Sequence, residues 1–381
     1  MSVRPLTEYC TLNMGQSPDS KTYNTQGKGL PFYQGNADFG ETHPITRVWC
    51  SAPVKVAEEG DILISVRAPI GAMNMAVEHC CIGRGLAALT PIRNKCSKQF
   101  LYYALQSKVD YLIAQGTGST FKAISKKVLE ATRIPAYSTI EQEQIAETIG
   151  HVDNTIAARR KQLALLDQLV KSRFIELFGD PKQNPKGYPV KEFDEISVLI
   201  TDGEHATPRR TDKGIYLLSA RNILNHALLL DDVDYIDEEE YTRIARRVVP
   251  QAGDVLISCS GSIGRCCIVP EELRFQMVRS AALIRFDDTI KPIFAEWLIT
   301  SDELQRQISM SATQSSQANL FQGKIRKLRG YVPPMELQGQ FAAFVEQTNK
   351  SKYYSSLSFR YCQAAANTYR QEWMTCRTSD F

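Results

Sequence analysis

The sequence predicts an α+β protein with two tandem α+β domains in a pseudo-twofold arrangement, separated by long antiparallel coiled-coil helices. Two observations predict this class. A set of motifs occurs twice in the same order, at an interval of about 190–200 residues. A sustained apolar heptad pattern lies between the two copies. The length of 381 residues allows two or three domains, and the apolar content of 43% is typical of a globular protein.

A glycine-bounded apolar run marks one strand in each copy. Gly60-Asp-Ile-Leu-Ile-Ser65 returns as Gly253-Asp-Val-Leu-Ile-Ser258, and an Ile-Gly pair follows each run a few residues later. Continuous apolar, β-branched residues between glycines are typical of a buried strand. Further upstream, an apolar run that ends in polar residues over 29–36 parallels a similar run over 214–222.

The second part of each copy is predicted to be helical. Apolar residues recur at helical spacing over 97–115 and again over 290–309. A polar stretch, a basic segment and an Ile-Pro or Val-Pro element follow in both copies, and each copy ends in a Gln-rich helix start, at Glu141 and Glu336. We therefore expect one mixed domain over residues 1–140 and another over 181–335.

A long helix is expected between the copies, over residues 141–180. Its apolar residues step by alternating fours and threes, which predicts a coiled-coil seam of four to five heptads: Ile145, Ile149, Val152, Ile156, Leu163, Leu166, Val170 and Leu177. Gly179-Asp-Pro181 marks its end. The predicted partner is a distal helix over 336–381, which contains Phe341. The heptad pattern is lost from Tyr353, so this helix is expected to be short, or atypical after about residue 352.

Charge and missing motifs favour a binding protein over an enzyme. Net charge is +3; residues 1–140 hold 15 Lys and Arg against 10 Asp and Glu, whereas 181–335 hold 20 against 21. We find no phosphate-binding loop, nucleophile elbow, adenine-methylation motif or metal-ligand spacing. Ten cysteines without a CxxC pair, a start without an apolar signal and no apolar run long enough for a membrane span favour the cytoplasm.

These features together resemble one family, the specificity (S) subunit of type I restriction–modification systems. The resemblance covers about residues 1–350. The following segments carry it: 60–71 (GDILISVRAPIG), 118–127 (GSTFKAISKK), the Ile134-Pro135 element, the helix starts at 141 and 336, and 177–180 (LFGD). One departure is Pro135-Ala-Tyr137, where the second copy has the more usual Pro333-Pro334.

The resemblance implies a non-catalytic DNA-binding subunit. Each mixed domain would be a target-recognition domain that reads one half of a bipartite double-stranded DNA site. The helices would separate these domains and dock two methylation subunits, and a motor–nuclease subunit where the system has one. The complex would be a DNA adenine methyltransferase or type I site-specific deoxyribonuclease. S-adenosylmethionine, ATP and Mg would belong to the partner subunits, and this chain would hold no cofactor or metal.

Base reading requires side chains with fixed donor and acceptor patterns, such as Arg for guanine and Asn or Gln for adenine. The candidates at predicted strand ends are Gln34, Asn36 and Arg67 in the first copy, and Arg221, Asn222 and Arg265 in the second. Hydroxyl and basic residues suited to phosphates are Ser119, Thr120, Lys122, Lys126 and Lys127, with Lys324, Arg326 and Lys327 in the second copy. For each of these residues, turn capping or a solvated surface is the structural alternative.

Two other functional classes remain open from the sequence. One is a free-standing DNA-modifying enzyme whose catalytic motifs have diverged. The other is an assembly scaffold without sequence preference. Methyl transfer by the purified chain alone would favour the first, and binding without preference among DNA sequences would favour the second.

Overall fold

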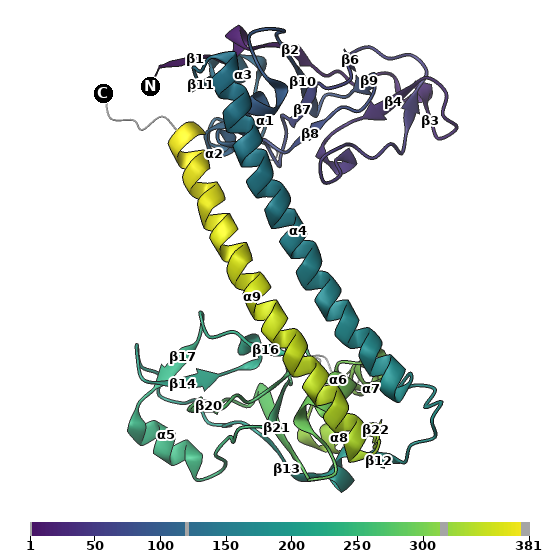
Figure 1. Cartoon of the computed structure of the whole chain (residues 1–381), viewed down its shortest axis with the longest axis vertical. Helices are drawn as coiled ribbons and strands as arrows, with labels where there is room; N and C mark the ends of the chain where they lie inside the picture. The colour runs from purple at the N-terminus through teal and green to yellow at the C-terminus, as the bar shows by residue number, and fades with distance from the viewer. Residues whose placement is uncertain (1, 119–121, 313–318, 375–381) are drawn as a thin grey trace. The chain divides into compact units, whose positions relative to one another are not determined.

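The computed structural model describes residues 2–118, 122–312 and 319–374. The chain divides into two compact units. Unit 1 comprises Met1–Lys161 and Ser356–Phe381, and unit 2 comprises Gln162–Ser355. Two 40-residue helices, α4 (Thr139–Phe178) and α9 (Met335–Met374), each contribute to both units (Figure 1).

A four-stranded antiparallel sheet lies at the centre of unit 1. Its order is β2-β10-β7-β8, with bounds Cys10–Met14, Leu86–Pro91, Ile62–Ser65 and Met73–Met75. Ile62 and Ile64 of β7 pack into a core with the helices, while Leu63 packs on the other side. The apolar run is therefore buried on both faces, as its lack of alternation predicts.

Different elements pack on the two faces of this sheet. Three helices lie on one side: α1 (Lys98–Gln106), α2 (Val109–Ala114) and α3 (Lys126–Ala131). A second sheet of order β3-β5-β4-β9-β6 packs on the other side, with bounds Tyr23–Asn24, Trp49–Cys50, Leu30–Tyr33, Cys80–Ile82 and Val56–Ala57. Helices and this outer sheet thus enclose the central sheet.

Unit 2 repeats the central sheet strand for strand. Its order is β13-β21-β18-β19, with bounds Ser197–Asp202, Ala281–Phe286, Val255–Ser258 and Cys266–Ile268. The register also repeats: Leu63 pairs with Ala88, and Leu256 pairs with Leu283. The helices are α6 (Pro292–Ile299), α7 (Asp302–Ala312) and α8 (Gln322–Arg326).

The outer part of unit 2 differs more from that of unit 1. Its sheet has three strands in the order β17-β14-β20, with bounds Asp234–Ile236, Ile215–Leu218 and Phe275–Met277. A hairpin, β15 (Ile223–Leu224) and β16 (Ala227–Leu228), and helix α5 (Glu238–Ala245) complete it. The parallel pair β14–β20 corresponds to β4–β9 of unit 1.

In each unit a short two-stranded sheet leads into a long helix. In unit 1, β1 (Val3–Pro5) pairs with β11 (Arg133–Pro135), which precedes α4. In unit 2, β12 (Val190–Glu192) pairs with β22 (Arg329–Tyr331), which precedes α9. The predicted α+β fold class with long helices is confirmed, since the mixed architecture occurs in both units.

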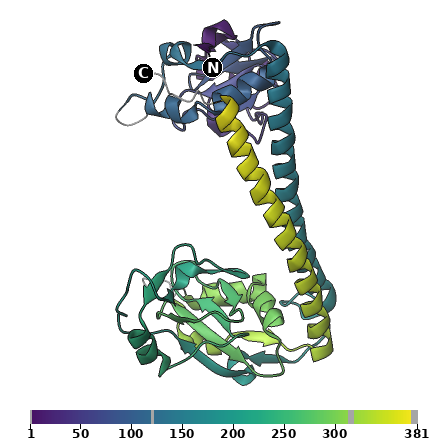
Figure 2. The same ribbon diagram turned by 60° about the vertical axis from the view of Figure 1, so that its left-hand side comes forward.

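The long helices pack side by side and antiparallel within each unit (Figures 1 and 2). In unit 1, Asp153 of α4 accepts a hydrogen bond of 2.6 Å from Arg370 of α9, and Arg160 lies over the ring of Phe359. In unit 2, Phe174 packs against Phe341 with ring centroids 5.4 Å apart. The numbers rise along α4 as they fall along α9, which makes the pairs antiparallel.

The distal helix does not end near residue 352. Helix α9 continues to Met374, and Ala366 in its last part is buried. The apolar heptad disappears there because other contacts replace it. These are the Arg370–Asp153 ion pair and a hydrogen bond of 3.1 Å from the Tyr137 hydroxyl to the Trp373 carbonyl. The expectation of a short helix was therefore wrong.

Candidate nucleic-acid interface

A pocket of about 380 Å³ opens at the end of the central sheet in unit 1. Two turns form its floor: the chain leaves β7 at Ser65, and it enters β10 through Gly83–Leu86. The Val66 N–H donates to the Gly85 carbonyl at 2.9 Å, so the two turns are held together. Among the residues that line the pocket are Gln34, Asn36 and Arg67, all three candidates predicted for the first copy.

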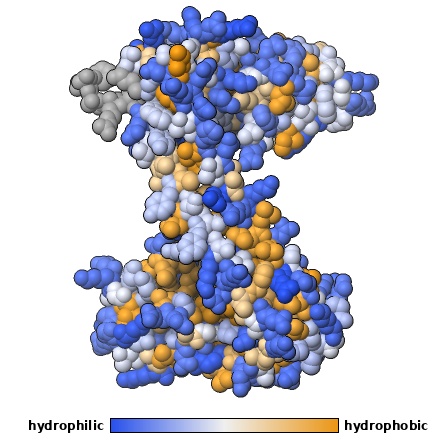
Figure 3. Space-filling view, viewed as in Figure 1, coloured by the Kyte–Doolittle hydropathy of each residue, from blue (hydrophilic) through white to orange (hydrophobic). Residues whose placement is uncertain are grey.

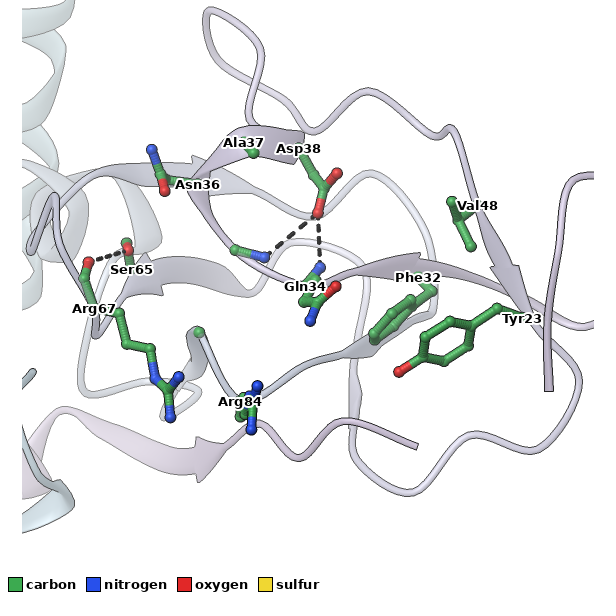
Figure 4. Close-up of a pocket in the computed structure, with 12 residues that line it drawn as sticks. Tyr23, Phe32, Gln34, Asn36, Ala37, Asp38, Val48, Ser65, Arg67 and Arg84 are labelled. Atoms are coloured by element: carbon green, nitrogen blue, oxygen red, sulfur yellow. Dashed lines mark hydrogen bonds between the residues drawn. The ribbon is translucent and has the colours of Figure 1, made fainter. Parts of the chain in front are cut away.

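Two arginines line this pocket, Arg67 from the turn after β7 and Arg84 from the turn before β10 (Figure 4). Both side chains are exposed, and neither guanidinium has an ion pair within the described ranges. The one carboxylate in the lining, Asp38, accepts the Gln34 N–H at 2.7 Å. Two guanidinium groups against one carboxylate that is engaged by backbone N–H groups suit an anion or the acceptor edge of a base.

The other end of the pocket is aromatic. The rings of Tyr23 and Phe32 are stacked with centroids 4.6 Å apart, and Figure 4 shows them opposite the two arginines. The Tyr23 hydroxyl donates to the Pro18 carbonyl at 3.0 Å. Partial burial raises the pKa of Tyr23, so the phenol stays neutral at physiological pH. The pocket therefore combines an aromatic wall with exposed cationic donors.

The predicted phosphate loop is described in part. Ser119 and Thr120 lie outside the described residues. Lys122 is exposed beside the Arg67 turn, because its carbonyl accepts the Ala68 N–H at 3.1 Å. Lys126 forms an ion pair of 3.4 Å with Glu130 on α3, whereas Lys127 is exposed with no acid contacting it in the part of the chain that the structure describes.

The candidates of the second copy are placed differently. Asn222 is fully buried, and its amide is used up by the backbone: its oxygen accepts the Ser219 N–H at 2.9 Å, and its nitrogen donates to the carbonyls of Leu229 and Asp232. This side chain holds a loop and has no free group with which to contact a base. The structural alternative, capping of a turn, describes Asn222 best.

The other two candidates of the second copy lie nearer the surface. Arg221 is bound by acids, at 3.0 Å from Asp234 and 3.9 Å from Asp232. Arg265 is half-buried beside β19, and no ion pair to it is found in the described ranges. Of the three candidates of unit 2, one is therefore buried, one is in an ion pair and one is half-buried.

The second basic segment is also partly neutralised. Arg326 forms an ion pair with Asp194 and donates to the Ile200 carbonyl at 2.9 Å. Lys324 is half-buried, and Lys327 is exposed. Of this cluster, Lys327 is therefore the most accessible cation.

Sequence reasoning missed two residues that occupy the same place in both copies. Arg84 and Arg279 each occupy the second position of a tight turn, since the Leu86 N–H donates to the Gly83 carbonyl and the Ala281 N–H to the Val278 carbonyl. A signal was present: Arg84-Gly-Leu-Ala-Ala and Arg279-Ser-Ala-Ala-Leu both precede a strand of the central sheet. The copies were also misaligned upstream, because Asp38, not Asn36, performs the loop-closing role of Asn222.

The residues that the structure describes contain neither a candidate metal site nor a candidate membrane span. No group of three or more His, Cys, Asp or Glu side chains is arranged to hold a metal ion among them. No helix there has the length and apolar character that a membrane crossing requires.

Comparisons with known proteins agree with the fold and the motifs. Residues 1–168 match the family model described as type I restriction modification DNA specificity domain. The chain is 41% identical over 167 residues to the putative type I restriction enzyme MjaX specificity subunit of Methanocaldococcus jannaschii, a match of 43% of this chain and 39% of that protein. It is 22% identical over 315 residues to the type I restriction enzyme EcoBI specificity subunit of Escherichia coli, covering 75% and 66%.

A solved structure supports the fold along the whole chain. The type I restriction–modification system S subunit from M. genitalium aligns with a TM-score of 0.66 and 16% identity, over 99% of this chain and 96% of that one. The chain matches 39% and 66% of the lengths of the two curated relatives above. The domain match over residues 1–168 and the curated relatives thus make this chain similar to type I restriction enzyme specificity subunits.

Proposed function

We propose that this chain is the non-catalytic DNA-recognition subunit of a type I restriction–modification complex. Units 1 and 2 would each read one half of a bipartite double-stranded site. The observation that carries the proposal is the unit 1 pocket, where the guanidinium groups of Arg67 and Arg84 face no free carboxylate. Guanidinium groups of this kind donate to guanine edges and to phosphates.

The long helices would dock two methylation subunits, and a motor–nuclease subunit where the system has one. Large apolar side chains are exposed on these helices, namely Leu165, Leu169, Ile175 and Leu357. Figure 3 shows apolar surface along the helices. An exposed apolar patch on a helix is typical of a protein–protein interface. The partners would supply S-adenosylmethionine, ATP and Mg chemistry.

A domain exchange tests the proposal directly. Residues 181–335 are replaced by the corresponding segment of a relative, and the complex with the methylation subunits is used to methylate a random-sequence duplex library. We expect one half of the methylated site to change and the other half to stay the same. A change in both halves would contradict independent reading by the two units.

Two controls separate the alternatives. Methyl transfer by the purified chain alone, with DNA and S-adenosylmethionine, would indicate a free-standing enzyme. Equal binding to all sequences over a range of salt concentrations would indicate a scaffold without sequence preference.

A further inference from the structure

The repeat permits a comparison that the proposed function makes informative. If the two units read different half-sites, they share a need to hold the DNA backbone but differ in the bases that they contact. A residue that occurs at the same backbone position in both units, without a structural role in either, is a candidate for contacting the DNA backbone. A residue that differs between the units at an equivalent exposed position is a candidate for contacting the bases.

Arg84 and Arg279 occupy the same backbone position in the two units. Besides the turns that hold them, the flanking hydrogen bonds coincide: Val66 N–H to the Gly85 carbonyl at 2.9 Å, and Cys259 N–H to the Ser280 carbonyl at 2.8 Å. On the other side, Gly83 donates to Tyr33 at 2.8 Å and Val278 donates to Leu218 at 2.9 Å. The turn and the hydrogen bonds on both sides of it are therefore equivalent, although the Arg84 N–H donates to the Ser17 hydroxyl and the Arg279 N–H to the Glu204 carbonyl.

No structural requirement explains an arginine at this position. Both side chains are exposed, and neither is in an ion pair with any residue that the structure describes. The second position of a tight turn accepts most residue types. In unit 1, Arg84 also shares its pocket with a second guanidinium, a repulsive arrangement that an anion would relieve.

Arg67 is an exposed residue whose equivalent in unit 2 is different. It forms a bridge with Ala123, and its equivalent in unit 2 is Ser260, which forms the corresponding bridge with Asn319. Both follow the glycine-bounded strand by the same interval, since Ser65 and Ser258 make the same hydrogen bonds to the turn that contains Ile70 or Ile263. The two positions are therefore equivalent by their bridges and flanking bonds, but a long bidentate donor in unit 1 is replaced by a short hydroxyl in unit 2.

We propose that Arg84 and Arg279 are equivalent phosphate anchors, one for each half-site, whereas the position of Arg67 and Ser260 determines base specificity. This inference rests on the proposed function. Arginine binds a phosphate wherever the sequence places one, so the anchors carry no base preference. Arg67 would donate to the acceptors of a guanine in the half-site of unit 1.

The test uses the full chain assembled with its methylation subunits and a random-sequence duplex library. Arg84→Ala and Arg279→Ala should each weaken binding to every sequence equally, by about eightfold at 0.1 M salt, and lower the salt slope by about 0.9. The enriched sequence should not change. Arg84→Lys keeps the charge and should restore most of the slope. Arg133→Ala, an exposed arginine of β11, is the matched charge control.

Arg67→Ser places the unit 2 residue in unit 1 and should weaken base discrimination in one half-site. We expect discrimination at one base pair to fall by at least about fivefold, with the other half-site unchanged. The inference is overturned if Arg84→Ala or Arg279→Ala changes the enriched sequence or leaves the salt slope unaltered, or if Arg67→Ser weakens all sequences equally. Failure of the unmodified complex to enrich any sequence would instead contradict the proposed function.

Discussion

Units 1 and 2 share a backbone but use their charges differently. In unit 1, Arg67 and Arg84 line a pocket and form no ion pair with any described residue. In unit 2, acids neutralise several arginines, as Arg209 shows with Asp237 at 2.8 Å and Arg221 with Asp234 at 3.0 Å. The comparison teaches that the number of basic residues does not locate a binding surface. What matters is which cations are left without a carboxylate.

The interiors of the two units differ in whether a buried aspartate has a countercharge. Asp61 and Asp254 occupy the same position before the inner strand, and each accepts a backbone N–H, from Glu58 at 2.9 Å and from Gln251 at 2.7 Å. In unit 2, Arg285 neutralises Asp254 through hydrogen bonds of 2.8 and 2.7 Å. The register places Thr90 at that position in unit 1, so Asp61 is buried and no ion pair to it is found among the described residues.

The largest expected effect comes from changing the helix that both units share. A two-residue insertion after Lys161 rotates one part of the α4 seam by about 200° relative to the other, since each residue turns about 100°. Either unit would then lose its packing against α9, and we expect assembly with the methylation subunits to fail. Co-purification of those subunits with the chain measures this.

A matched insertion keeps the seam. Seven residues after Lys161 together with seven after Ser355 preserve the pairing with α9 in each unit, with a phase drift of about 20°. We expect an active complex whose nonspecific spacer is longer by about one to three base pairs, with both half-sites unchanged. Activity with the original spacer would show that the helices do not set the spacing.

The buried aspartates provide the second test. Arg285→Thr gives unit 2 the residue of unit 1 and leaves Asp254 buried without its partner. We expect the free energy of unfolding to fall by about 2–3 kcal/mol, near the lower end for a broken buried pair because Arg285 is partly exposed. Urea denaturation measures it. Adding Asp254→Asn should recover part of the loss, and no loss in Arg285→Thr would show that the pair does not stabilise the unit.

The basic segments of the two units should also differ in how strongly they bind DNA, because an ion pair and a hydrogen bond hold Arg326 of unit 2, whereas an ion pair of 3.4 Å holds Lys126 of unit 1. Changing Lys122, Lys126 and Lys127 to Ala should weaken binding to all sequences equally, and lower the salt slope by up to about 0.9 for each lost phosphate contact. We expect the smallest share from Lys126, because Glu130 already pairs with it. Salt titration of binding to duplex DNA measures the slope.

The matched change in unit 2 sharpens this prediction. Replacing Lys324, Arg326 and Lys327 by Ala should lower the slope less, since Arg326 is bound to Asp194. Equal slope changes in the two loops would contradict the idea that ion pairing decides which cations reach DNA. A loss confined to one sequence would identify base contacts instead.

The smallest effect concerns the pH dependence of unit 1. Burial raises the pKa of Asp61 above its ordinary value, so the folded protein binds a proton more tightly than the unfolded chain. Its contribution to stability is therefore greatest at low pH, and decreases as pH rises through the ordinary pKa to the raised one. Asp61→Asn should remove this decrease. A difference in unfolding free energy between the two proteins that does not change with pH would refute the prediction.

The pocket could be predicted in part. Gln34, Asn36 and Arg67 were expected at strand ends, and they line one pocket because parallel and antiparallel neighbours bring those ends together. Arg84 could have been found by aligning the copies on the strand that follows it. Asn222 could not have been excluded, because the three backbone groups that use up its amide lie in loops whose course the sequence does not reveal.

The sequence by itself determined the elements that repeat and pack locally. Continuous apolar runs and heptads predict buried strands and long helices because burial follows directly from residue type and period. Only the tertiary structure decided which charges remain available. Arg326 meets Asp194 132 residues away, and Arg370 meets Asp153 across two helices 217 residues apart in sequence. Such partners are set by the folded path of the chain, so no local pattern distinguishes a neutralised arginine from a free one.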